Sequence, residues 1–122
     1  MWLHEDAPAM KIIYDSLRQL GITTNYRGFY YAAYGVWLCS REPELLLLVT
    51  KWLYPEVAAR YQTTWGAVER GIRTVVAVAW RQNPELLCRL ANFQLTEKTQ
   101  PGQFLSILSA GLFPAFEWKD DG

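Results

Sequence analysis

The stretch "TTWGAVERGIRTVVAVAW", residues 63–80, predicts a long amphipathic helix that runs from about 64 to 81. At about 100° per residue, its bulky aliphatic side chains fall on one stripe. That stripe consists of Val68, Ile72, Val75 and Ala79. The opposite face starts with a small residue and then carries cations: Gly66, Arg70, Arg73 and Ala77, with Thr74 beside them and Glu69 at the border. We therefore expect a helix that buries the stripe and presents arginines to solvent or to a ligand.

The preceding residues predict a shorter helix, at about 54–61. "YPEVAARYQ" is amphipathic, and Ala58 is small enough to permit a tight crossing. A short helix, a brief turn and a longer helix form the helix-turn-helix arrangement. Thr63 and Thr64 can cap the second helix and donate to a phosphate. Arginines one turn later can reach phosphates or the acceptor pair of guanine.

Charge is unevenly distributed along the chain. The net charge is zero, with 12 basic and 12 acidic residues, which excludes a uniformly basic DNA-binding coat. Residues 51–81 nevertheless hold five basic side chains against two acidic ones, and the remainder of the chain has the opposite excess. Any nucleic-acid surface must therefore be local, and we expect it around Arg60, Arg70 and Arg73, with Lys51 at its edge. The alternative is that these arginines are simply solvated, as on any amphipathic helix pair.

The rest of the chain also has the patterns of helices. A segment at 8–20 opens with Pro8, carries Ile12, Ile13, Leu17 and Leu20, and closes at Gly21. A segment at about 25–40 has Asn25 as its expected cap. Its side chains Tyr30, Tyr34, Trp37 and Leu38 fall on one side, and a pair of strands is the alternative there.

Three further helices are expected. "EPELLLLVTKW", residues 42–52, is apolar nearly all round and should be the central buried element. Residues 83–93 begin with Asn83 as cap and Pro84 at the first position, and residues 101–113 form the last helix. The tails, about 1–7 and 115–122, should fray. The sequence thus predicts one all-α domain over 1–122, a compact bundle of about six helices containing a helix-turn-helix motif.

Composition narrows the function classes. Of the 122 residues, 51% are apolar, which excludes a disordered chain. Cys39 and Cys88 are expected to be buried, reduced thiols of a cytoplasmic protein. The longest aliphatic run, "LLLLV", is too short to cross a bilayer, and no targeting segment is visible. No glycine-rich phosphate loop, nucleophile elbow or paired catalytic carboxylates occur, so we expect no enzyme, cofactor or metal site, and the single histidine, His4, should be solvated.

Tryptophans are frequent for a chain of this length. Trp37, Trp52 and Trp80 fall on apolar stripes and are expected in the core. Trp65 either packs under the motif or contacts a thymine methyl or sugar. Trp2 and Trp118 lie in the two tails, where an exposed ring can mark a dimer contact.

"TKWLYPEVAARYQTTWGAVERGIRTVVAVAW", residues 50–80, resembles the C-terminal DNA-binding effector domain of the master sporulation response regulator of endospore-forming bacteria. "YRGFYYAAYGV", residues 26–36, resembles the region between that family's first two helices, and the similarity runs from about 11 to 108. Its most specific part is a set of residues at fixed spacing: Tyr54, Pro55, Thr63, Thr64, Val68, Glu69, Arg70, Ile72, Arg73, Ala79 and Trp80.

The resemblance implies a six-helix fold, sequence-specific binding of double-stranded DNA in transcription control, and neighbouring copies that touch on tandem sites. It implies that the second motif helix reads the major groove. Glu69, Arg70 and Arg73 inherit the DNA-facing roles, and Thr63 and Thr64 inherit the role at the turn and helix start.

This sequence departs from the family at Gly66 and Ala67, where the family usually has polar and basic residues, including an arginine that reads a base. Losing one bidentate contact is worth about 1–3 kcal/mol of discrimination, so the target is expected to differ from the family's usual site, or binding to be less selective. Family members also carry a receiver domain. Nothing here is long enough to be one, so we expect a stand-alone effector-like protein or a fragment.

Two hypotheses follow. In the first, the chain is a DNA-binding transcription regulator that acts as a homodimer or in tandem copies. Its expected DNA-binding residues are Lys51, Arg60, Thr63, Thr64, Trp65, Gly66, Glu69, Arg70, Arg73 and Thr74. In the second, it is a protein-interaction module of the same fold that has lost base readout and modulates a regulator or RNA polymerase, for example through the sigma subunit. Gly66 and Ala67 favour the second, whereas Glu69, Arg70 and Arg73 favour the first.

Overall fold

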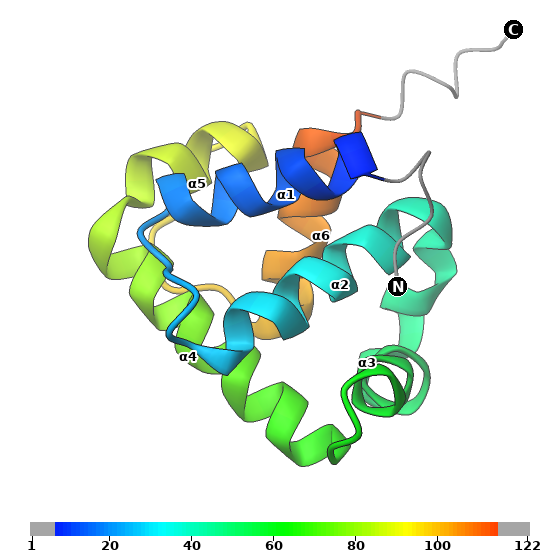
Figure 1. Ribbon diagram of the computed structural model, residues 1–122. Coiled ribbons are helices and arrows are strands. Elements are labelled where there is room, and N and C mark those ends of the chain that lie inside the picture. Colours follow the sequence, from blue (N-terminus) through cyan, green and yellow to red (C-terminus); the bar gives the residue numbers. More distant parts are fainter. Residues whose placement is uncertain (1–6, 115–122) are drawn as a thin grey trace, which may run out of the picture.

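Six α-helices make up the fold in a computed structural model of the chain, which describes residues 7–114 (Figure 1). Their bounds are α1 Ala7–Gln19, α2 Arg27–Arg41, α3 Tyr54–Arg60, α4 Trp65–Gln82, α5 Pro84–Ala91 and α6 Pro101–Leu112. A 3₁₀ helix, η2 Pro43–Leu48, and a π-helix, η3 Val49–Leu53, connect α2 to α3. Residues 7–114 contain no strand, so the predicted all-α bundle is confirmed and the strand alternative for residues 25–40 is wrong.

Helix α2 is central to the packing. Its most extensive contact is with α4. It also packs on α6 and α1, which lie around it in Figure 1. The side chains that fill this core are aliphatic and aromatic and fully buried; the largest are Phe29, Phe104, Ile13, Leu17, Leu20, Ile22, Leu53, Ile72, Leu87, Leu105 and Leu108. Helix α4 thus lies on a packed core and not on a flexible arm.

Two glycines allow α2 and α4 to approach closely. A Cβ at Gly28 would overlap the carbonyl oxygen of Gly71, and a Cβ at Gly71 would lie 2.9 Å from Cδ2 of Tyr31. At Gly28 the backbone of α4 would have to move, and at Gly71 the ring of the buried Tyr31 would have to shift. The crossing of the two helices is therefore set by the absence of side chains at Gly28 and Gly71.

Helix ends follow local sequence signals at several points. Gly21 has φ of +97°, and the amide of Ile22 donates to the carbonyl oxygen of Leu17 at 3.0 Å, so the predicted stop of α1 is confirmed. Asn83 caps α5 as expected, because its Oδ1 accepts from the Leu86 amide at 3.2 Å. Asn25 is not the cap of α2, since the capping position is Tyr26 and no side chain bonds there.

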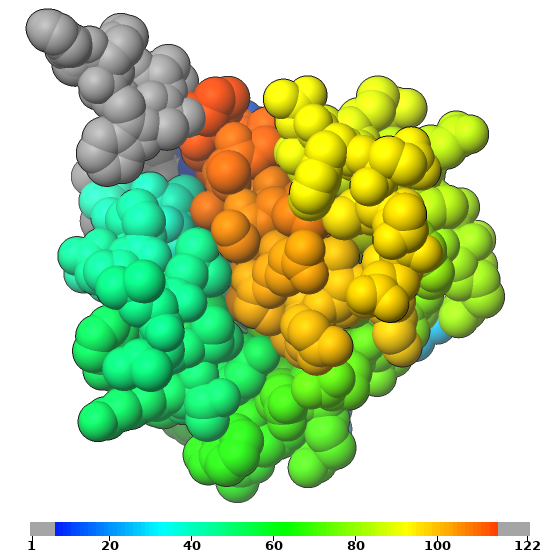
Figure 2. Space-filling view, turned by 180° about the vertical axis from the view of Figure 1, so that it is seen from behind, coloured from blue at the N-terminus to red at the C-terminus, as the bar shows by residue number. Residues whose placement is uncertain are grey.

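The segment predicted to be the central buried helix, 42–52, is neither central nor α-helical. None of the residues in η2 is buried, and 75% of the surface of Leu47 is exposed. The chain leaves helical geometry at Leu48, with φ of −140° and ψ of 76°, before η3 begins. Figure 2 shows this segment at the surface beside α6. The prediction failed because a run of four leucines has no polar face, so periodicity cannot show which side is buried.

Several aromatic and aliphatic residues also lie on other faces than expected. Trp52 is 40% exposed instead of belonging to the core, whereas Trp37 and Trp80 are half-buried against it. Tyr30 and Ile12 are exposed as well. The buried face of α2 combines three larger side chains, Phe29, Tyr31 and Leu38, with smaller residues: Gly28, Ala32, Ala33, Gly35, Val36 and Cys39. The small residues on this face let α2 and α4 cross at close range, and Tyr30, Tyr34 and Trp37 are less buried than Phe29 and Tyr31.

The predicted fraying tails fall almost entirely outside the described residues, as do Trp2, His4 and Trp118. The prediction of a frayed tail is wrong at Ala7, which is the first residue of α1. None of the helices within residues 7–114 is long and apolar enough to cross a membrane.

The two thiols differ in accessibility. Cys39 is buried, and burial raises the pKa of its thiol from 9.0 to about 12. Cys88 is only half-buried, so the expectation of burial is wrong there, and its Sγ accepts a hydrogen bond from the Leu95 amide at 3.4 Å.

We therefore expect a thiol-alkylating reagent to modify Cys88 first near neutral pH, because the thiolate is the reactive form and Cys39 is both covered and protonated. Peptide mass mapping of briefly treated protein should find the label on Cys88, and denaturant should expose Cys39. Equal labelling of both cysteines in the folded protein would contradict the described burial.

Candidate nucleic-acid interface

Helices α3 and α4 are joined by a tight turn, residues 61–64. Gln62 adopts a left-handed conformation with φ of 54°, which reverses the chain within a few residues. The amide of Thr63 donates to the carbonyl oxygen of Ala58 at 3.0 Å, and that of Tyr61 donates to Val57 at 3.2 Å. These bonds tie the turn back onto α3, so the two helices have a fixed relative orientation. Sequence reasoning did not single out Gln62, since glutamine carries no signal for positive φ.

The inner face of α4 holds this pair of helices on the core. Val68, Ile72 and Val75 are each 0% exposed, as the apolar stripe predicted. Val57 and Ala58 of α3 are buried in the same cluster. Side chains on the opposite face of α4 are therefore presented outward from a rigid support.

The first turn of α4 is capped as the sequence predicted. Thr64 has extended backbone angles, and its Oγ1 accepts a hydrogen bond from the Ala67 amide at 3.1 Å. Thr63 lies half-buried in the turn before it. The other backbone amides of the first turn have no partner within the helix and point along its axis. This end of α4 therefore carries partial positive charge.

Two arginines lie on the outer face with different surroundings. Arg70 is exposed, and its Nη1 lies 3.5 Å from the point where a Cβ on Gly66 would stand, so its side chain extends back over the glycine. Arg73 is also exposed, but its Nη2 donates to Oε2 of Glu69 at 2.7 Å. Glu69 therefore offsets much of the charge of Arg73 and leaves that of Arg70 less affected.

Thr74 is exposed on the same helix, but its hydroxyl donates to the carbonyl oxygen of Arg70 at 3.1 Å. Because that proton is used within the helix, the free capacity of Thr74 is as an acceptor. Thr74 would therefore contribute little to the binding of an anionic ligand in this conformation.

Arg60 is at the end of α3, next to the turn. Its guanidinium lies over the ring of Tyr34 at 5.4 Å and over that of Tyr61 at 5.9 Å. Burial raises the pKa of both phenols, and Arg60 opposes that shift. Stacking on two rings fixes the position of this cation at the base of the turn. Sequence reasoning missed Tyr34 as its partner because the two are far apart in the chain.

Lys51 belongs to η3 and is exposed. It lines a shallow groove together with Trp52, Pro55 and Glu56. The structure thus gathers most predicted site residues on α4 and the preceding turn, places Arg60 beside that turn, and leaves Lys51 on a separate element.

Trp65 is the first residue of α4 and is 50% exposed. It is not among the described side chains that pack against the core, so the interpretation that it packs under the motif is wrong. Its angle on the helix does point toward the apolar stripe. The first turn of α4, however, lies at the lower edge of the molecule in Figure 1, and half of the Trp65 surface is exposed there.

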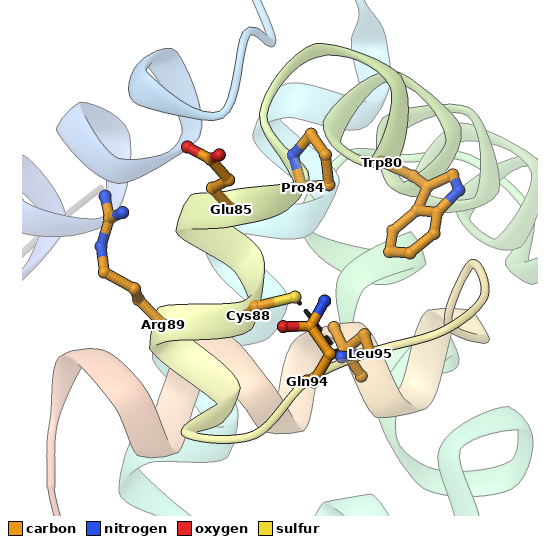
Figure 3. Close-up of a pocket in the computed structure, with 7 residues that line it drawn as sticks. All are labelled: Trp80, Pro84, Glu85, Cys88, Arg89, Gln94 and Leu95. Carbon is orange, nitrogen blue, oxygen red and sulfur yellow. Dashed lines mark hydrogen bonds between the residues drawn. The ribbon is translucent and has the colours of Figure 1, made fainter.

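A pocket of about 480 Å³ lies at the opposite end of α4, where α5 begins. Figure 3 shows Trp80, Cys88 and Leu95 around it, while the side chains of Glu85 and Arg89 extend away from Trp80. Its lining is largely apolar and it lies far along α4 from the first turn. We therefore do not include it in the candidate interface.

A comparison with known protein families places the chain in one of them. The family described as "Sporulation initiation factor Spo0A C terminal" matches residues 13–112. The match contains both helices of the motif and begins in the middle of α1. The chain therefore belongs to the family of Spo0A C-terminal domains, which are DNA-binding effector domains of transcription regulation.

Proposed function

We propose that this chain binds duplex DNA sequence-specifically, with α4 in the major groove and α3 across the adjacent backbone. The observation that carries the proposal is the division of α4 into two faces. Val68 and Ile72 are 0% exposed on one side, while Arg70 is exposed on the other. A helix anchored in this way presents its outer face to a groove without rearrangement of the fold.

Most of the predicted site residues have surroundings that suit a role in DNA binding. Arg70 is the principal cation for a base edge or phosphate, and the absence of a side chain at Gly66 leaves room for the guanidinium of Arg70 to extend along the helix toward its first turn. Glu69 and Arg73 act as a pair, in which the carboxylate can accept from a cytosine amino group. Thr63 and Thr64 serve the sugar-phosphate backbone, as do Arg60 and Lys51, whereas Thr74 contributes little because its hydroxyl donates within the helix.

The proposal includes a setting and partners. We place the activity in the cytoplasm, on the chromosome, with a second copy of the chain on an adjacent half-site. RNA polymerase, through its sigma subunit, is the proposed protein partner. The competing function is a module that binds such proteins without contacting DNA; the first turn of α4 favours it, since Gly66 and Ala67 cannot donate hydrogen bonds from their side chains.

Titration of the chain with random-sequence duplex separates the two functions. DNA binding through phosphates predicts that affinity falls steeply between about 50 and about 200 mM salt. Fluorescence anisotropy of a labelled duplex measures this directly. Absence of salt-dependent binding at any protein concentration that remains monodisperse would exclude the DNA-binding function and leave the interaction module.

Substitution of Arg70 should weaken DNA binding more than substitution of Arg73. We expect Arg70→Ala to reduce affinity for a selected duplex about tenfold, within the range of about 1–3 kcal/mol for one base contact. Arg73→Ala should have a smaller effect, because the guanidinium of Arg73 already donates to Glu69 at 2.7 Å and has fewer hydrogen-bond donors free for DNA.

Arg89→Ala is the matched control, since Arg89 is an exposed arginine on α5. None of the three variants should change the midpoint of thermal unfolding appreciably, because exposed substitutions usually alter stability by less than about 0.5 kcal/mol. A large fall in that midpoint for Arg70→Ala would show that the residue supports the fold.

A further inference from the structure

An exposed tryptophan occupies the start of the proposed reading helix. Trp65 is 50% exposed at the first position of α4, although tryptophan is among the largest apolar side chains. The capping bond of Thr64 to Ala67 fixes the backbone on either side of it. The ring therefore projects from a rigid helix end and not from a loose loop.

The rest of the first turn lacks charged and amide side chains. Gly66 and Ala67 follow Trp65, and the nearest guanidinium, that of Arg70, lies over Gly66 one turn later. Residues four apart lie on the same edge of a helix, so Trp65 shares its edge of α4 with Glu69. An apolar surface at the tip of the helix therefore adjoins a polar surface formed by Glu69, Arg70 and Arg73.

The N-terminal residues of a recognition helix are those that meet base edges. In the major groove, the apolar group on those edges is the C5-methyl of thymine. We infer that Trp65 is a specificity-determining residue that selects thymine through contact of its ring with this methyl group. The inference rests on the proposed DNA-binding function and assigns the base to which the tip of α4 responds.

The test compares binding sites that differ by single methyl groups. Duplexes are first selected from a random library by the wild-type chain and, separately, by Trp65→Ala. Each thymine of the wild-type site is then replaced by uracil, which removes the methyl and keeps base pairing. For one or two adjacent thymines we expect wild-type affinity to fall about fourfold, the equivalent of one buried methyl group. Trp65→Ala should bind those thymine and uracil duplexes equally.

Two further variants separate recognition of thymine by the Trp65 ring from a general effect of removing an exposed ring. Trp65→Phe keeps an apolar ring and should retain most of the discrimination against uracil. Phe93→Ala removes a ring that is 56% exposed and follows α5, a helix that lies away from the start of α4 in Figure 1, and this variant should discriminate as the wild type does. Thermal unfolding of all three variants verifies that they are folded before titration.

Each outcome has a defined meaning. If the chain shows salt-dependent binding but every uracil substitution affects wild type and Trp65→Ala equally, the inference is overturned while DNA binding stands. The same holds if both proteins select the same sequence with the same thymine preference. If the wild-type chain enriches no duplex and binds none in a salt-dependent way, the proposed function fails, and the inference fails with it.

Discussion

The variant Gly28→Ala should lose a large share of its stability. A Cβ at this position would overlap the carbonyl oxygen of Gly71, so α2 and α4 would have to move apart at their main contact. Backbone atoms cannot yield as the end of a flexible side chain can. Overpacking a core lowers the free energy of unfolding by about 1–3 kcal/mol where side chains can adjust. Because backbone is in contact here, we expect a loss of about 3 kcal/mol or more. That is a large share of the roughly 5–15 kcal/mol that stabilises a domain.

Gly66→Ala is a closely matched control. Gly66 is the second residue of α4, as Gly28 is the second residue of α2, but a Cβ there would meet only Arg70 Nη1 at 3.5 Å and Thr64 Oγ1 at 4.0 Å. Alanine should be neutral or stabilise the helix by up to about 1 kcal/mol. Urea unfolding followed by circular dichroism measures both variants. Equal stability of the two proteins would show that Gly28 does not set the helix crossing.

Binding to two adjacent half-sites should exceed binding to one by about 100-fold or more, since a second copy that touches the first binds at a raised effective concentration. A single copy has few cations to contribute. If Lys51, Arg60, Arg70 and Arg73 all met phosphates, the log–log salt slope would be about −3.6, and the Glu69–Arg73 ion pair reduces this further. A net charge of zero leaves little repulsion between copies.

The measurement is a titration on duplexes with one half-site and with two. A matched control inserts about 5 base pairs between the half-sites, which turns the second copy to the opposite side of the duplex while keeping both sequences. We expect a steep curve on the contiguous site and independent binding on the spaced one. Equal affinity per half-site on all three duplexes would rule out contact between neighbouring copies.

The sequence was most informative where one face of a helix differs sharply from the other. Helix α4 could be predicted with its buried stripe, its Thr64 cap and its exposed arginines, because each depends on spacing within a single helix. The cap of α5 at Asn83 and the end of α1 at Gly21 could be predicted equally well, since helix caps depend on neighbouring residues in the sequence. The family resemblance extended these local predictions to the whole six-helix fold, and the match over residues 13–112 confirmed it.

Features that depend on distant parts of the chain could not be predicted in this way. The leucines of η2 have helix-forming composition, but the core is already filled by α2, α4 and α6, so the segment lies outside it. The exposure of Trp65 depends on where the core ends, which its helical angle does not reveal. The Glu69–Arg73 ion pair has suitable spacing for prediction, whereas the stacking of Arg60 on Tyr34 requires the tertiary fold.

The segment formed by η2 and η3 also affects the solubility of the protein. Leu47, Leu48 and Trp52 expose apolar surface on a chain whose charges balance, so colloidal repulsion between molecules is weak. Salts that are excluded from protein surfaces, such as sulfate, would promote precipitation through this patch. The same ions would also screen the electrostatic attraction between the cationic side chains of the protein and the phosphates of DNA. Chloride buffers of moderate strength therefore suit purification, and Leu47→Lys offers a route to higher solubility that leaves α4 and the core unchanged.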